Sequence, residues 1–235
     1  FKCDWSSDVC SSDLILTIED PIEYELQGIV QAQVNTAVGL TFATALRAFL
    51  RFDPNVIMVG EIRDGETANI AVQAALTGHL VLTTLHTETA AAAAPRLIDL
   101  GVEDFLLQST LRAAIGQRLV RILCEHCKTR ATLDRETYER DPSYGMIGLR
   151  IGETIWEPRG CDRCGGSGYR GRAGVFEILE ATPAVRGMLK RGVDGPSIEA
   201  KAREGGFRTM VEDAVTRCRA GLTSASEVLR VTSIR

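Results

Sequence analysis

The chain has 235 residues, of which 45% are apolar and 25% are charged. This composition is typical of a soluble globular protein with one large domain or one core plus appendages, and it excludes a wholly disordered chain. The net charge of −4 and the pI of about 5.5 give no overall positive field that would attract nucleic acid or anionic lipid, although local basic patches are still possible. The longest uncharged stretch, 68–87, contains polar side chains and a turn signal, so we predict no membrane span.

The first residues have an unusual composition. The stretch from Asp4 to Leu14 reads as the translation of a sequencing-library adapter, so we expect residues 1–14 to be non-native or disordered. The alternative is a natural polar tail, which would also be disordered. No positively charged leader with an apolar segment begins the chain, and a reducing cytoplasm is therefore the expected compartment.

From Ile15 onward, strand-like and helix-like segments alternate. We expect short strands at 15–18, 56–59 and 79–84, and helices at 41–52, 67–76, 90–94 and 96–100. Pro21 follows the first strand, Gly78 ends the second helix, and Pro95 divides the last two helices. Strands that alternate with helices predict an α/β fold with a largely parallel sheet.

Chemically active side chains follow the three predicted strands. Glu19 follows the first strand, Glu61 the second and His86 the third. Because ligands bind beyond the carboxyl ends of the strands in open parallel sheets, we expect these three side chains to meet at one edge. His79 begins the third strand, and a strand of this length separates it from His86 by roughly 23 Å. This separation favours an architectural role for His79.

The strand before Glu61 has the Walker B pattern, a buried strand running into Gly-Glu, in which a carboxylate orients water or Mg²⁺. A lone carboxylate at a strand end is more often simply solvated. Arg47 and Arg51 share one helix face, and their pattern favours about equally a solvent-exposed face and the stabilisation of phosphoryl charge. No G-x-x-x-x-G-K-[ST] phosphate loop occurs in the printed chain, so we expect the back half of a nucleotide-hydrolysing motor.

Four cysteines form two C-x-x-C pairs, Cys124 with Cys127 and Cys161 with Cys164. Two such pairs supply the thiolates of a tetrahedral Zn²⁺ site, and a closed shell of four thiolates has a structural role. Two disulfides are disfavoured by the expected compartment, and four unrelated thiols are disfavoured by the repeated spacing. His126 lies inside the first pair and ranks below the cysteines as a ligand.

The last part of the chain is predicted to be a strand followed by a small helical part. We expect the strand at 174–180 and helices near 184–190, 197–203, 210–220 and 224–230. Ser224 and Glu227 have the spacing of a capping box for the last helix. The lone Cys218 is most simply a small core residue.

Several of these segments together resemble the secretion ATPase superfamily. Residues 17–23 (TIEDPIE) resemble its Asp box, residues 59–64 (VGEIRD) its Walker B segment, and residues 77–87 (TGHLVLTTLHT) its His box. The four-cysteine element and residues 227–232 (EVLRVT) are similar to the assembly ATPases of type II secretion and type IV pili. The resemblance covers about residues 15–234 and implies a RecA-like P-loop NTPase sheet that is truncated at its N-terminal edge.

The resemblance also implies an activity and partners. Proteins of this family are cytoplasmic homohexamers that dock on a platform protein at the bacterial inner membrane and are peripheral to it. They use ATP and Mg²⁺ to add pilin-like subunits to a filament. Direct contact with nucleic acid is not expected.

Roles for individual residues follow from the same motifs. By resemblance, Glu61 activates the attacking water, Glu19 supports Mg²⁺ and water, and His86 acts on the phosphates. Arginines that complete the site, some of them reaching a neighbouring subunit, are Arg47, Arg51 and Arg63. Further candidates for nucleotide binding within these motifs are Asp20, Glu23, Gly60 and His79.

The resemblance implies three native segments: a partial RecA-like ATPase domain at 15–123, a zinc-binding element at 124–172, and a C-terminal strand and helical subdomain at 173–235. The chain departs from the family pattern at Asn55, where an Asp is usual, and in the alanine run at 90–94. The missing phosphate loop is the larger departure, because its amides and lysine supply most contacts to the β- and γ-phosphates. We therefore predict that the chain alone neither hydrolyses ATP nor folds well.

Two functions from other classes stay open. One is a hexameric RecA-like nucleic-acid translocase, and the other is a zinc-ribbon interaction module without enzymatic activity. Basic residues do surround the four-cysteine element, namely Arg118, Arg121, Lys128, Arg130, Arg163, Arg170 and Arg172. Salt-dependent DNA binding by this segment would favour these alternatives.

Overall fold

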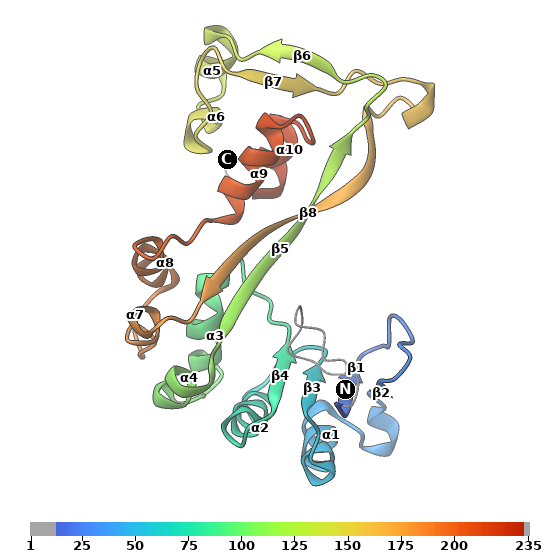
Figure 1. Ribbon diagram of the computed structural model, residues 1–235, viewed down its shortest axis with the longest axis vertical. Helices are drawn as coiled ribbons and strands as arrows, with labels where there is room; N and C mark the ends of the chain where they lie inside the picture. Colours follow the sequence, from blue (N-terminus) through green and yellow to red (C-terminus); the bar gives the residue numbers. More distant parts are fainter. Residues whose placement is uncertain (1–12, 233–235) are drawn as a thin grey trace. The chain divides into compact units, whose positions relative to one another are not determined.

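The computed structural model describes residues 13–232 (Figure 1). Most of the adapter-like segment therefore lies outside the described residues. The described chain divides into two compact units, each with its own apolar core. Unit 1 comprises the described part of Phe1–Arg112 together with Ala181–Lys201, and unit 2 comprises Ala113–Glu180 with the described part of Ala202–Arg235.

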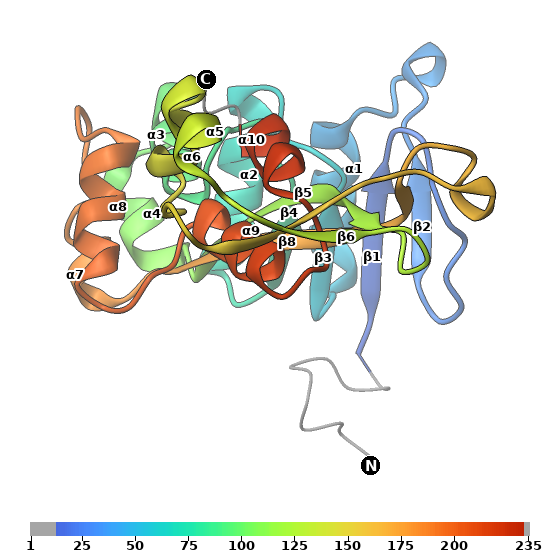
Figure 2. The ribbon, with the colours of Figure 1, turned by 90° about the horizontal axis from the view of Figure 1, so that it is seen from above.

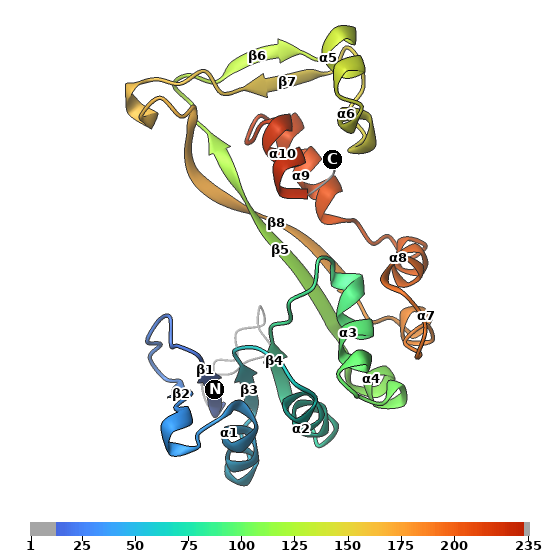
Figure 3. The same ribbon diagram turned by 180° about the vertical axis from the view of Figure 1, so that it is seen from behind.

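A four-stranded parallel sheet organises unit 1, in the order β2-β1-β3-β4 (Figure 3). Its strands are β1 (Ile15–Glu19), β2 (Val30–Gln33), β3 (Val56–Val59) and β4 (Leu80–Thr83). The two central strands, β1 and β3, are the two runs with almost continuous apolar burial, as expected when both faces of a parallel sheet are covered. The predicted α/β fold with a parallel sheet is confirmed.

Helices of unit 1 pack against this sheet and against each other. They are α1 (Phe42–Phe49), α2 (Gly65–Leu76), α3 (Ala93–Asp99), α4 (Asp104–Thr110), α7 (Pro183–Arg186) and α8 (Gly195–Arg203), the last extending two residues into unit 2. Short 3-10 turns lie at Thr36–Val38, Leu50–Phe52 and Ala90–Ala92. Helix α1 packs on β1, helix α2 packs on β4, and the two helices also contact each other. Their side chains close the core around Ile18, Leu46 and Ile57, which are all fully buried.

Local signals explain where these helices begin and end. Thr41 and Thr44 form a capping box for α1, and the Asp64 carboxylate accepts the Thr67 backbone N–H at the start of α2. The predicted helix at 41–52 instead ends at Phe49 and tightens into a 3-10 turn. The alanine run forms a 3-10 turn, and Pro95 lies in the first turn of α3, where its missing N–H needs no partner.

A long antiparallel ribbon organises unit 2. It pairs β5 (Ala113–Leu123) with β8 (Tyr169–Glu180), and Leu123 pairs with Tyr169 at one end (Figure 1). Strand β5 was not anticipated from the sequence, and β8 begins five residues earlier than the predicted strand. A second antiparallel pair, β6 (Thr129–Thr132) with β7 (Thr154–Glu157), lies in the segment that joins the two ribbon strands.

Helices complete unit 2. They are α5 (Arg135–Arg140), α6 (Ser143–Met146), α9 (Met210–Arg219) and α10 (Ala225–Thr232), with a 3-10 turn at Asp162–Cys164. Helices α9 and α10 pack against the ribbon and against each other (Figure 2). Cys218 lies fully buried in this core, and burial raises the pKa of its thiol to about 11, as suits an unreactive core residue.

The two compact units cut across the segments expected from the sequence. Residues 181–201 belong to the same unit as the parallel sheet and contact helix α4 through α7, and the four-cysteine element shares a unit with α9 and α10. The functions assigned to the predicted segments, those of an ATPase domain and a zinc-binding element, stay predictions. Across residues 13–232, none of the helices combines the length and apolar character that crossing a bilayer requires.

Candidate functional site

The carboxylate of Glu61 lies just beyond the end of β3 and has two partners. Arg63 Nη2 donates to Glu61 Oε1 at 2.5 Å, and His86 Nε2 lies 3.1 Å from Glu61 Oε2. The Glu61 side chain is only 14% exposed, whereas the His86 ring is 86% exposed. The hydrogen bond from Arg63 lowers the pKa of Glu61, with a further contribution from His86 against the opposing effect of burial. Glu61 is thus an ionised, oriented carboxylate at neutral pH.

Glu19 ends the neighbouring strand β1 and is almost fully buried. Its Oε1 accepts hydrogen bonds from Thr17 Oγ1 at 2.6 Å and from Gln31 Nε2 at 2.9 Å. Both donors stand on the same sheet, Thr17 two residues earlier on β1 and Gln31 on β2. The sheet therefore fixes the position of the Glu19 carboxylate without help from a loop.

Gly60 brings the ends of β1 and β3 close together. Its N–H donates to the Ile18 carbonyl at 2.8 Å, and its carbonyl accepts from Thr84 Oγ1 at 2.7 Å. A Cβ at position 60 would lie 3.2 Å from the Ile18 carbonyl oxygen and 3.3 Å from the Glu19 Cα. A side chain would therefore push apart the two strand ends that carry Glu19 and Glu61.

Asp20, the next residue of the Asp box, lies at this same edge. Arg63 Nη1 lies 4.0 Å from Asp20 Oδ2, so Arg63 stands between the carboxylates that follow β1 and β3. Glu23 is exposed in the segment between β1 and β2. We call the group Glu19, Asp20, Glu61, Arg63 and His86 the carboxylate rim.

Two predicted site residues lie at the opposite end of the strands, just before β3 and β4 begin. His79 directly precedes β4, and its Nε2 lies 4.0 Å from the carboxylate of Asp53, which precedes β3. The Nδ1 of His79 lies 2.9 Å from the Ala74 carbonyl, so the ring ties the end of α2 to the start of β4. Arg51 lies in the 3-10 turn just before Asp53. Within one chain, neither residue joins the carboxylate rim.

Arg47 has a different partner. Its Nη2 lies 2.5 Å from Glu66 Oε1, in an ion pair between α1 and the first turn of α2. Both side chains are more than half exposed. Such a pair contributes little to stability, typically less than about 1 kcal/mol.

Sequence reasoning missed the residues that hold the rim in place. Thr17 and Gln31 orient Glu19, and Thr84 binds the Gly60 carbonyl. The period of two along β1 puts Thr17 on the same face as Glu19 and was a usable signal. Nothing in the sequence indicated Gln31 or Thr84, because their contacts depend on strand order.

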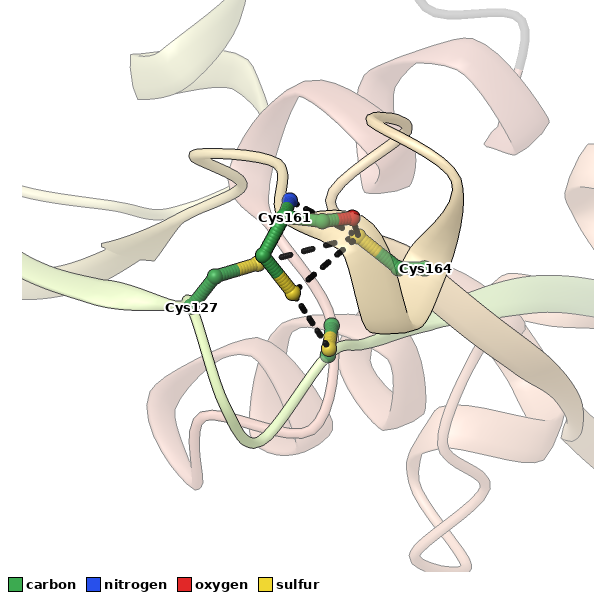
Figure 4. Close-up of side chains that lie close together, drawn as sticks. Cys127, Cys161 and Cys164 are labelled. Atoms are coloured by element: carbon green, nitrogen blue, oxygen red, sulfur yellow. Dashed lines mark hydrogen bonds between the residues drawn. The ribbon is translucent and has the colours of Figure 1, made fainter.

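The four cysteines meet at one end of the ribbon. The Sγ atoms of Cys124 and Cys161 are 3.9 Å apart, those of Cys127 and Cys164 are 3.9 Å apart, and those of Cys161 and Cys164 are 3.8 Å apart. Figure 4 shows the sulfurs of Cys127, Cys161 and Cys164 turned toward one another. All four ligand atoms lie within 4.8 Å of one another.

These distances fit a zinc ion. A regular tetrahedron with a Zn–S distance of about 2.3 Å has edges of about 3.8 Å. A disulfide needs sulfurs about 2.05 Å apart, and all four cysteines are free thiols in the structure. His126 is exposed and contacts Arg163, outside the ligand group. The donor set is therefore the four cysteines that the spacing predicted.

The backbone around the second cysteine pair, Cys161 and Cys164, favours metal binding. The N–H groups of Cys161 and Gly168 each donate to Cys164 Sγ at 3.2 Å. Burial alone would raise the pKa of this thiol, but these hydrogen bonds, together with those from the Cys161 and Cys127 thiols, lower the pKa of Cys164 below its usual value. Gly160 has φ of +90°, and a Cβ there would lie 2.4 Å from the Gly166 carbonyl oxygen, so only glycine fits this turn.

Comparison with known protein families identifies the family of this chain. The model of the family described as "Type II/IV secretion system protein" matches residues 5–230. The chain belongs to this family. The resemblance drawn from the Asp box, Walker B and His box is thereby confirmed. The match begins inside the adapter-like segment, of which the structure describes only residues 13 and 14.

Curated members of the type II/IV secretion family include close relatives. The chain is 51% identical over 218 residues to the type II secretion system protein E of Klebsiella pneumoniae, covering 93% of this chain and 42% of that protein. It is 50% identical over 214 residues to the type IV pilus assembly ATPase PilB of Thermus thermophilus, covering 91% of this chain and 24% of that protein. The chain thus spans less than half the length of these relatives.

Solved structures of similar proteins have the same fold. The pilus retraction motor PilT with bound ADP superimposes with a TM-score of 0.63 at 28% identity, covering 94% of this chain and 52% of that one. The Legionella pneumophila ATPase DotB gives a TM-score of 0.62 at 26% identity, with 95% and 52% coverage. The predicted RecA-like ATPase fold is confirmed by these neighbours.

Proposed function

We propose that the chain is part of an ATP-hydrolysing motor of type II protein secretion or type IV pilus assembly, which powers the addition of pilin-like subunits at the inner membrane. Family membership and the named ATPases among its relatives support the class of protein. The observation that carries the activity is the carboxylate rim, where Glu61 is held ionised between Arg63 and His86 beside the buried Glu19.

Each rim residue has a role in this proposal. Glu61 accepts the proton of the attacking water, and its bonds to Arg63 and His86 orient the carboxylate oxygens. Glu19 and Asp20 hold Mg²⁺ and its water shell, since carboxylate oxygens suit this ion. Bound Mg²⁺ neutralises phosphate charge. His86, with its ring 86% exposed beside Glu61, contacts the phosphates.

Residues away from the rim are proposed to act between subunits. Arg51 lies at the opposite end of the sheet, and Arg47 lies on the exposed face of α1. In a homohexamer such side chains complete the site of a neighbouring copy rather than their own, as guanidinium groups do in other nucleotide hydrolases. His79, with its side chain only 9% exposed, supports the structure between α2 and β4. Gly60 lets the ends of β1 and β3 approach each other closely. Glu23 provides an exposed carboxylate near the bound nucleotide.

The four cysteines are proposed to bind one Zn²⁺ that holds the ends of β5 and β8 together. A closed shell of four thiolates leaves no open position for catalysis, so the ion is structural. The proposed motor works on the cytoplasmic face of the inner membrane, attached peripherally through a platform protein.

The printed chain alone is proposed to be inactive, because it contains no G-x-x-x-x-G-K-[ST] motif to cradle the phosphates. ATP turnover by the purified 235-residue chain would contradict this part of the proposal. The activity itself needs a longer version of the protein that carries such a loop.

The experiment compares Glu61→Gln with the wild type in that longer version. Removal of a general base typically costs 10²- to 10⁴-fold, so we expect ATP turnover to fall at least 100-fold while ATP binding persists. Glu103→Gln, an exposed carboxylate of the same unit before α4, is the matched control and should keep normal turnover. Normal turnover by the Glu61→Gln variant would refute the assignment of the rim as the catalytic site.

A further inference from the structure

Unit 2 contains a positively charged pocket that the proposed motor activity does not use. The pocket has a volume of about 440 Å³ and is lined by Leu119, Arg121, Arg172 and Arg230. The three arginines come from β5, β8 and α10, elements that are far apart in sequence and packed together in this unit. A pocket of this size matches those that hold small-molecule ligands.

One buried carboxylate offsets part of this charge. The fully buried Glu227 accepts hydrogen bonds from Nε and Nη2 of Arg121 and from Nε and Nη2 of Arg230, at 2.7–2.9 Å. Within residues 13–232, Arg172 forms no salt bridge, and its side chain is exposed. Three guanidinium groups and one carboxylate give the pocket a net charge of +2.

Arg121 and Arg230 are also held in fixed orientations. The Arg121 guanidinium stacks over the Tyr169 ring at 4.1 Å, and the Tyr169 hydroxyl lies 2.6 Å from Ser224 Oγ. Glu227 engages Nε and Nη2 of both arginines and leaves Nη1 of each to other partners. Because these side chains are ordered before a ligand arrives, binding incurs a smaller entropic cost.

We propose that this pocket binds a phosphate group that carries about two negative charges, such as that of a phosphate monoester. A phosphate monoester carries about 1.5 to 2 negative charges at neutral pH and offers three acceptor oxygens, which match the net charge and the three guanidinium groups. A carboxylate or a phosphodiester carries one charge and leaves the pocket half neutralised. Arginine is the residue best suited to such planar recognition.

Isothermal titration calorimetry of the zinc-loaded 235-residue chain tests the proposal, with inorganic phosphate as the probe. The poor folding predicted for this chain concerns the sheet of unit 1, whereas the pocket lies in unit 2, which has its own apolar core. Arg172→Gln should weaken phosphate binding about tenfold or more, the usual effect of losing a charge-assisted pair. Arg170→Gln is the matched control, because it removes the same charge from the same strand two residues away and does not line the pocket. We expect less than a twofold change for this variant.

Three results would overturn the proposal. They are the absence of inorganic phosphate binding at millimolar concentration, equal losses in the Arg172 and Arg170 variants, and acetate binding as strong as that of inorganic phosphate. Zinc content and circular dichroism of each variant confirm that the fold is kept. Vesicles containing phosphatidic acid, compared with pure phosphatidylcholine, identify the source: Arg172-dependent vesicle binding assigns a lipid headgroup, and its absence beside phosphate binding assigns a soluble phosphate.

Discussion

Replacing Glu227 by glutamine removes a buried carboxylate that joins helix α10 to strand β5 in unit 2. The side chain is fully buried and accepts the Arg121 backbone N–H as well as the guanidinium groups of Arg121 and Arg230. Glutamine keeps the size of the side chain but loses its charge and half of its acceptor capacity. The two guanidinium groups would then lie close together without a counter-charge.

The expected loss follows from the pKa of this carboxyl group. Burial alone would raise it, but the hydrogen bonds from Arg230 and Arg121 outweigh burial and lower the pKa of Glu227 from 4.5 to about 2. At about 1.4 kcal/mol per pKa unit, the ionised form is stabilised by about 3 kcal/mol in the folded state. The two arginine side chains are about half exposed, so solvent screens them, and we expect a loss of about 2 kcal/mol at pH 7.

The pH dependence has a definite sign. Because the folded-state pKa lies below the unfolded value of 4.5, this contribution is present above pH 4.5 and is lost as the pH falls toward 2. The difference in stability between wild type and Glu227→Gln should therefore stay constant from pH 8 to about pH 5.5 and shrink at lower pH. Release of zinc by acid affects both proteins alike and cancels in the difference.

Urea unfolding followed by tryptophan fluorescence measures this difference. Trp156 lies in unit 2 and is the reporter, and Trp5→Phe in all variants removes the other tryptophan. Glu139→Gln is the control, because its exposed pair with Arg135 should change stability by less than about 0.5 kcal/mol. A Glu227→Gln loss no larger than that of the control, or a difference that grows as the pH falls, would refute the reasoning.

Three further changes test other parts of the molecule. Cys161→Ser should reduce bound zinc from about one per chain to a small fraction by elemental analysis and lower the melting temperature; a metal-free wild type with an unchanged melting curve would contradict this. Gly60→Ala should destabilise unit 1 by about 1–2 kcal/mol in urea, since its Cβ would crowd the Ile18 carbonyl. Arg47→Gln should lower the free energy of unfolding by less than about 1 kcal/mol, because its pair with Glu66 is exposed. A large fall in ATP turnover of the loop-bearing protein would therefore assign Arg47 to catalysis.

The sequence anticipated features that depend on short stretches of chain. The runs at β1 and β3 are apolar enough to be central strands, and each leads directly into its acidic residue. The geometry of a parallel sheet then brings Glu61 and His86 to one edge, 3.1 Å apart, although 25 positions separate them. The repeated cysteine spacing likewise identified the four thiols that cluster.

Long-range pairing could not be predicted in the same way. Strand β5 (AAIGQRLVRIL) lacks a regular alternation of apolar and polar residues, and it is a strand because β8 pairs with it along its length. The segment between the cysteine pairs holds the antiparallel pair β6–β7 and two short helices, which no local pattern indicated. The predicted capping box of α10 is only half formed: Ser224 accepts the Glu227 N–H, while Arg121 and Arg230 engage the Glu227 carboxylate.

By itself, the sequence determined the family, the acidic strand ends and the four metal-binding thiols, because each is encoded by neighbouring residues or by a fixed spacing. Only the tertiary structure decided that Arg51 lies at the end of the sheet opposite Glu61, and that Glu227 joins two arginines beside a third. These contacts depend on strand order and on helix packing across more than 100 positions. Local sequence patterns do not indicate such long-range contacts, because the free energy that favours these contacts comes from burying several segments at once.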